Sequence, residues 1–119
     1  MHIYEVILVK YKYGIFSQEQ LHEYKKLLHN KIHWLLIYEE SSYPKLDEYI
    51  SSLQFQIAAL AELINSPQII NLADIIECIR IEYQKDSHNH KKYRKLVFDA
   101  HSVVDLLPET DGDSNGRFI

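Results

Sequence analysis

The feature that most restricts the fold of this chain is a helical repeat of apolar residues near its middle. Six aliphatic side chains recur between residues 46 and 64 at alternating spacings of four and three: Leu46, Ile50, Leu53, Ile57, Leu60 and Ile64. They form one stripe of an α-helix, because a helix completes a turn every ~3.6 residues. A seam this short is typical of packing inside a helical bundle rather than of a free coiled coil.

Short breaks separate this helix from others of similar length. Pro44 predicts its start, because proline is tolerated only in the first turn of a helix. Ser66 followed by Pro67 predicts an N-cap and a first turn, so a third helix extends from there to about Gln84. The polar run KDSHNH then ends that helix and precedes a last one.

The first long helix is predicted over 17–38. Ser17 and Gln20 are spaced as a capping box, in which each side chain bonds the backbone N–H of the other residue. Apolar residues follow at helical spacing: Leu21, Leu28, Ile32 and Leu35. With a last helix over 89–107, the chain has four long amphipathic helices joined by short loops. This pattern predicts an all-α fold, an up-down-up-down antiparallel four-helix bundle.

The N-terminal segment 2–13, HIYEVILVKYKY, fits two structures. Its β-branched and aromatic residues suit a strand. However, no other segment has the pattern of a strand, and a lone strand leaves its backbone groups unpaired. As a helix, the segment has Glu5 early, Lys10 and Lys12 late, and Gly14 at a stop position. We therefore expect an extra apolar segment that is helical. If it is instead a strand, its natural partner is the same strand of a second chain.

Composition restricts the class of protein. A chain of 119 residues is one domain, which we place at 1–107, followed by a disordered acidic tail at 108–119. The net charge of −4 argues against general polyanion binding. The single cysteine, Cys78, cannot form a disulfide within the chain. No apolar run approaches the ~20 residues of a membrane span, and the N-terminus lacks the features of a signal peptide. We expect a cytoplasmic protein without membrane contact.

Histidines line one flank of the first predicted helix, at the border between its apolar stripe and solvent: His22, His29 and His33. The last helix has a polar flank of the same rotational sense: His90, Arg94, His101 and Asp105. Flanks of the same sense face each other on antiparallel neighbours. By level along the bundle, we expect His33 to lie near His90 or Arg94.

The same comparison of levels along the bundle predicts that His22 lies near His101 and Asp105. Histidine and carboxylate ligands that converge between helices suit zinc or another divalent metal such as iron. The predicted metal ligands are His22, His29, His101 and Asp105. The alternative is that these histidines are simply hydrogen-bonded or solvated at the edge of the core.

Arg94 and His101 also share one face of the last helix, seven residues apart. This spacing resembles the Arg-x(4–6)-His motif of HEPN-type ribonucleases, small helical bundles that often dimerise across that motif. The resemblance implies that Arg94 binds the phosphate and that His101 acts in acid–base cleavage. Lys95 departs from the motif, since those families prefer Asn, Asp or His at that position.

The run HNHKKYRK, residues 88–95, is a concentrated basic segment with Tyr93 inside it. Such a run can contact phosphates, so nucleic acid is a candidate partner, although not the favoured one. The alternative is a solvated helix start.

Three apolar side chains fall outside the predicted core. Phe55 points away from the seam of its helix, and Ile70 and Ile81 lie on a second side of the third helix. A helix that is apolar on two sides is buried on two sides, so either the N-terminal segment or another chain covers it. We predict a homodimeric bundle of regulatory or adaptor type that acts through protein–protein contact. The alternative is an enzyme that processes nucleic acid or nucleotides, either a HEPN-like ribonuclease or a metal-dependent hydrolase.

Overall fold

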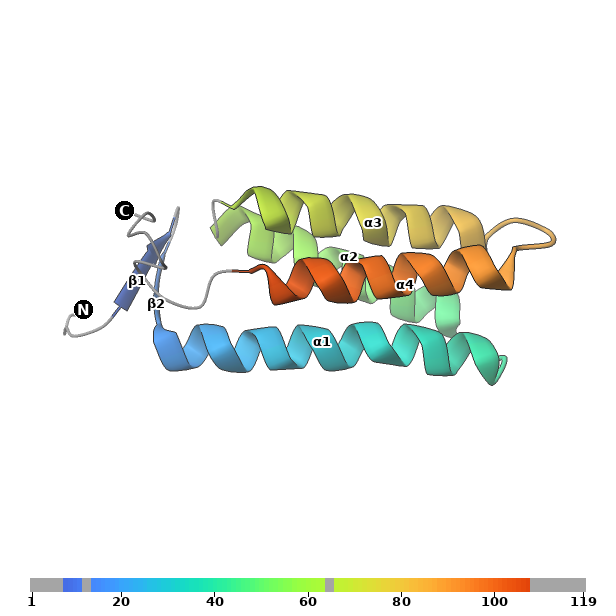
Figure 1. Ribbon diagram of the computed structural model, residues 1–119, viewed down its shortest axis with the longest axis horizontal. Coiled ribbons are helices and arrows are strands. Elements are labelled where there is room, and N and C mark those ends of the chain that lie inside the picture. Colours follow the sequence, from blue (N-terminus) through green and yellow to red (C-terminus); the bar gives the residue numbers. More distant parts are fainter. Residues whose placement is uncertain (1–7, 12–13, 64–65, 108–119) are drawn as a thin grey trace.

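The computed structural model describes residues 8–11, 14–63 and 66–107. Two strands precede four helices: β1 (Leu8–Tyr11), β2 (Gly14–Ser17), α1 (Gln18–Glu40), α2 (Leu46–Leu63), α3 (Pro67–Tyr83) and α4 (His90–Asp105). Figure 1 shows the four helices side by side, with the strand pair at the end of the bundle where α1 begins.

The helices form a closed ring of neighbours. Packing contacts join α1 to α2, α2 to α3, α3 to α4, and α4 back to α1. The loops between them are short, so consecutive helices run in opposite directions (Figure 1). The predicted up-down-up-down four-helix bundle is therefore confirmed.

The core is built from the apolar stripes that the sequence predicts. Five residues of the central seam are buried: Leu46, Ile50, Leu53, Ile57 and Leu60. Stripes from the other three helices meet them in a single cluster. Removal of this apolar surface from water is the main favourable term in folding.

Two tyrosines, the buried Tyr93 and the partly buried Tyr49, connect α1 to its neighbours. The hydroxyl of Tyr49 on α2 donates to the backbone oxygen of Lys31, and the hydroxyl of Tyr93 on α4 donates to that of Leu35, both at 2.7 Å. Burial raises the pKa of Tyr93, and burial together with Tyr38 raises the pKa of Tyr49 to about 12. Both phenols therefore stay neutral donors at ordinary pH.

The predicted helix starts of α3 and α4 are confirmed by their caps. The Ser66 hydroxyl accepts the backbone N–H of Gln68 at 3.3 Å, and Pro67 is the first helical residue. At α4, the side-chain oxygen of Asn89 accepts the N–H of Lys92 at 3.0 Å. Each cap satisfies a backbone donor that the first turn leaves without a partner.

The expected helix in the N-terminal segment is wrong for residues 8–11. These residues form β1, which pairs antiparallel with β2; Leu8 lies opposite Ser17, and Tyr11 opposite Gly14. The partner that a lone strand lacks is supplied by the next few residues of the same chain. A second chain is therefore not needed to pair this strand on its β2 side.

Among the described residues, no helix is both long and apolar enough to span a membrane. Residues 2–7, 12–13 and the predicted tail at 108–119 lie outside the described part of the chain.

Candidate functional site

The predicted histidine flanks of α1 and α4 meet. The ring centroids of His29 and His101 are 4.2 Å apart, and those of His33 and His101 are 6.0 Å apart. His29 Nε2 lies 3.4 Å from Oδ1 of Asp105. We call these four residues the histidine cluster.

An open cavity of about 200 Å³ adjoins the histidine cluster. Its walls come from both helices: His22, Lys25, Lys26, His29, Val104 and Asp105. The Lys25 ammonium donates to the backbone oxygens of Asp105 at 3.2 Å and Leu107 at 3.1 Å. These carbonyls end α4, where the helix dipole favours a cation. His22 and Asp105 both line this cavity.

His101 is the most enclosed imidazole of the cluster. Its Nδ1 atom is buried and has no hydrogen-bond partner among the described residues. Burial lowers the pKa of His101 below its ordinary value of 6.5, and His29 and His33 lower it further, whereas Asp105 acts in the opposite direction. The neutral form of the ring therefore predominates at pH 7.

Arg94 does not join His101 directly, because Phe98 lies between them. The Arg94 guanidinium sits 5.2 Å from the ring centroid of Phe98, and the His101 ring lies 6.4 Å from the same centroid. Arg94 also contacts the carboxylate of Glu40 at 3.2 Å. A phosphate at Arg94 therefore has to compete with a carboxylate of the same chain.

Along the bundle axis, α1 is shifted relative to α4 by about two helical turns from the position that the sequence predicts. His33 lies beside His101 instead of His90 or Arg94, and His90 contacts Glu39. The cause is geometric: α1 and α4 are not consecutive, so the sequence carries no short loop that fixes how far one slides along the other.

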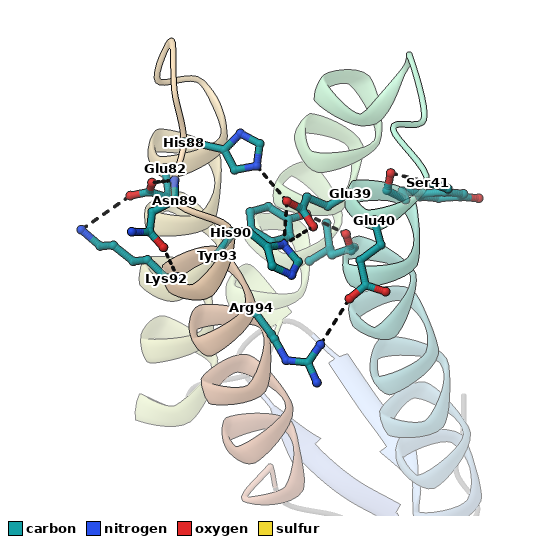
Figure 2. A network of polar contacts seen from close by, with 12 residues as sticks. Glu39, Glu40, Ser41, Glu82, His88, Asn89, His90, Lys92, Tyr93 and Arg94 are labelled. Atoms are coloured by element: carbon teal, nitrogen blue, oxygen red, sulfur yellow. Dashed lines mark hydrogen bonds and ion pairs between the residues drawn. The ribbon is translucent and has the colours of Figure 1, made fainter.

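A second polar cluster closes the far end of the α1–α4 interface. The Glu39 side chain is only 6% exposed. One of its oxygens lies 2.8 Å from His88 Nε2, and both oxygens contact His90 Nδ1, at 2.8 and 2.9 Å. Figure 2 shows the two imidazoles directed at Glu39 from the start of α4 and the loop before it. Burial of a carboxylate costs free energy unless it is paired and hydrogen-bonded. These contacts therefore stabilise the packing of α1 against α4.

Sequence reasoning missed this cluster. It treated His88 and His90 as part of a basic run and gave no role to Glu39. The available signal was the His-x-His spacing at a helix start, which faces an acidic helix end once four antiparallel helices are assumed.

The basic run of α4 is partly neutralised within the chain. Besides the Arg94 contact, Lys92 lies 3.6 Å from Glu82, which is 2% exposed. Glu82 accepts the backbone N–H of Asn89 at 2.7 Å and the ammonium of Lys85 at 2.9 Å, and these bonds lower its pKa to about 2 (Figure 2). Cations engaged in this way are less available to nucleic-acid phosphates.

The metal site stays a prediction. Within the described residues, no group of three or more His, Cys, Asp or Glu side chains is arranged to hold a metal ion. Of the predicted ligands, His29 lies beside both Asp105 and His101, and His22 shares the adjoining cavity. Ligation by three of them requires side-chain rearrangement.

The predicted interface residues lie on the opposite side of the bundle. Phe55 is 77% exposed, Ile70 is 55% exposed and Ile81 is 50% exposed. The α2–α3 contact is marked by Gln54, which donates to Glu77 at 2.5 Å. At ~100° per residue, both isoleucines lie within about 40° of Glu77 around α3, so they border α2. We call the three apolar residues the outer α2–α3 face.

Comparison of the chain with models of protein families, with curated proteins and with solved structures found no match.

Proposed function

We propose that this protein is a cytoplasmic helical bundle of regulatory or adaptor type that acts through protein–protein contact, as a homodimer formed by the outer α2–α3 face. The observation that carries the proposal is the exposure of Phe55, Ile70 and Ile81 on one side of the α2–α3 pair. Exposed apolar residues are common singly, but several together mark contact sites.

The rest of the described chain supports this proposal by leaving the face uncovered. The sequence offered two covers for α3, the N-terminal segment or a second chain. The described strands lie at the end of the bundle where α1 begins (Figure 1), and the isoleucines are at least half exposed in their presence. Full burial of a Phe or Ile side chain contributes roughly 1.5–3 kcal/mol, so association gains substantially by covering all three in both copies.

The oligomeric state tests the proposal. We expect the purified chain to sediment as a dimer, and Phe55→Asp to shift it to monomer. Leu27→Asp is the control, because Leu27 on α1 is an apolar residue that is 49% exposed outside this face and the substitution adds the same charge. A wild-type chain that stays monomeric throughout a concentration series contradicts the proposal, as does an equal effect of the two variants.

A second candidate function is an enzyme that processes nucleic acid or nucleotides, of HEPN-like or metal-dependent type. It is supported by His101, whose neutral ring has an unpartnered Nδ1 atom and lies among His29, His33 and Asp105. Such an imidazole suits general acid–base work. We expect Arg94→Ala and His101→Ala to abolish any cleavage of single-stranded RNA; wild-type protein without cleavage, with or without added zinc, ends this candidate.

A further inference from the structure

Charge is divided unequally between the two halves of the bundle. Helices α2 and α3 carry six carboxylates and one cationic side chain: Asp47, Glu48, Glu62, Asp74, Glu77, Glu82 and Arg80. Helices α1 and α4 carry six carboxylates and seven Lys or Arg side chains. The half of the bundle that displays the outer α2–α3 face is therefore acidic, and the other half is close to neutral.

Three exposed carboxylates share the side of the helices that carries the outer α2–α3 face. Glu48 and Glu62 are each seven residues from Phe55, within about 20° of it around α2. On α3, Asp74 is exposed and lies within about 40° of both isoleucines of the face. Each apolar residue of the face therefore has an exposed carboxylate in line with it. We call Glu48, Glu62 and Asp74 the acidic rim.

The cations of α3 and of the loop after it are engaged elsewhere. Arg80 donates to Glu77 at 2.9 Å and to Gln84 at 2.8 Å. Lys85 donates at 2.9 Å to Glu82, which is almost fully buried. Among the described residues, the acidic rim forms no ion pair. Its charge is therefore available to a partner.

A second copy that covers this face brings its own acidic rim with it, because a two-fold contact uses the same patch on both copies. Opposed like charges oppose association, whereas complementary charges steer encounter and select the partner. The homodimer proposed above therefore gains from apolar burial against a charge penalty. A partner with basic groups around its apolar residues gains from the same burial without that penalty.

The spacing of the face fits one side of a helix. Ile70 and Ile81 are eleven residues apart on α3, which is about 16.5 Å along the axis. A partner helix with apolar residues at positions i, i+4, i+7 and i+11 spans the same length, and helices are commonly recognised through anchors at this spacing. An extended peptide instead needs the edge of a sheet, and the outer α2–α3 face lies on helices.

We infer that the outer α2–α3 face binds a basic amphipathic helix of another protein, in exchange for the second copy of this chain. The apolar side of that helix covers the three exposed apolar residues, and its Lys and Arg residues face the acidic rim. This inference rests on the proposed function, contact through this face, and names the chemistry of the partner that regulates the homodimer.

A designed peptide tests the inference. The probe is a helix of about 18 residues with Leu at i, i+4, i+7 and i+11 and Lys at its flanking positions. The control peptide has the same composition with its leucines spread around the helix. We expect fluorescence anisotropy to show binding of the probe at least about tenfold tighter than that of the control peptide. We also expect sedimentation to show that the probe converts the dimer to a complex of one chain with one peptide.

Matched variants locate the binding site. Glu62→Gln with Asp74→Asn should weaken binding of the probe by about two- to thirtyfold, because two exposed ion pairs are lost. Glu19→Gln with Glu23→Gln makes the same change of net charge at exposed positions of α1 and should weaken it less.

The apolar part of the contact has its own pair of variants. Phe55→Ala should weaken binding at least about fivefold, as truncation of a central anchor does. Leu27→Ala, at an exposed apolar position on α1, should leave binding unchanged.

Each outcome has a defined meaning. Tight binding that is lost in the α2–α3 variants and displaces the second copy supports the inference. Equal effects of the matched variants overturn it, as does binding of the probe to a dimer that persists. A dimer that does not bind the probe overturns the inference and keeps the proposed homodimer. A chain that is monomeric without peptide and binds the probe at this face supports the helical partner but overturns both the exchange and the proposed homodimer.

Discussion

The α1–α4 interface and the outer α2–α3 face differ in how many of their polar groups are paired, although both sides of the bundle carry exposed apolar residues, such as Phe98 on α4. Between α1 and α4, several polar groups find partners in the same chain, as Glu39 does with His88 and His90, although His101 Nδ1 has none among the described residues. On the outer α2–α3 face, Phe55 and the neighbouring Ile81 are at least half exposed. The first pattern indicates contacts that stabilise the fold, whereas the second indicates a surface that gains from a partner. Changes on the first side should alter stability or its pH dependence, and changes on the second should alter association.

The largest expected effect compares two isoleucines of α3. Ile76 is fully buried and Ile81 is 50% exposed. We expect Ile76→Ala to lower the free energy of unfolding by about 2–5 kcal/mol, because it leaves a cavity in the core. We expect Ile81→Ala to change monomer stability little but to weaken the dimer. Urea unfolding and sedimentation, applied to both variants, measure the two effects. If a folded Ile76→Ala variant lost the dimer while Ile81→Ala kept it, the assignment of Ile76 to the core and Ile81 to the interface would be contradicted.

A smaller effect is expected on the α1–α4 side from Tyr93→Phe. This change removes the 2.7 Å hydrogen bond to the Leu35 carbonyl but keeps the ring. We expect the free energy of unfolding to fall by about 1 kcal/mol and the dimer to persist. Tyr43→Phe is the control, because Tyr43 stacks on Tyr38 and its ring is retained. Equal losses from both variants in urea unfolding would show that the buried hydrogen bond is not the cause.

Local signals predicted most of the fold. The Ser66 cap and the seam from Leu46 to Leu60 act within a few turns of the chain, so their outcome follows from sequence spacing. The N-terminal segment was misassigned because a strand depends on a partner. That partner, Gly14–Ser17, is too short to show a strand period of its own.

The candidate sites were predictable only in part. Helical phase correctly put His29 and His101 on facing flanks, since phase is set by residue number alone. Helical phase could not give the position of α1 relative to α4 along the bundle axis, because that position depends on how the ends of the two helices pack. For the same reason the Glu39 cluster, whose members come from distant parts of the chain, was not foreseen.

The pH dependence of stability is expected to respond to His101. Its pKa in the folded chain is below the ordinary value of 6.5. Between the two values the unfolded chain binds more protons, so stability falls as the pH drops from about 6.5 through the folded pKa. We expect His101→Gln to reduce this loss and His22→Gln, at an exposed position on the same flank, to keep it. Urea unfolding at several pH values measures the slope; an unchanged slope in His101→Gln would contradict the assigned burial.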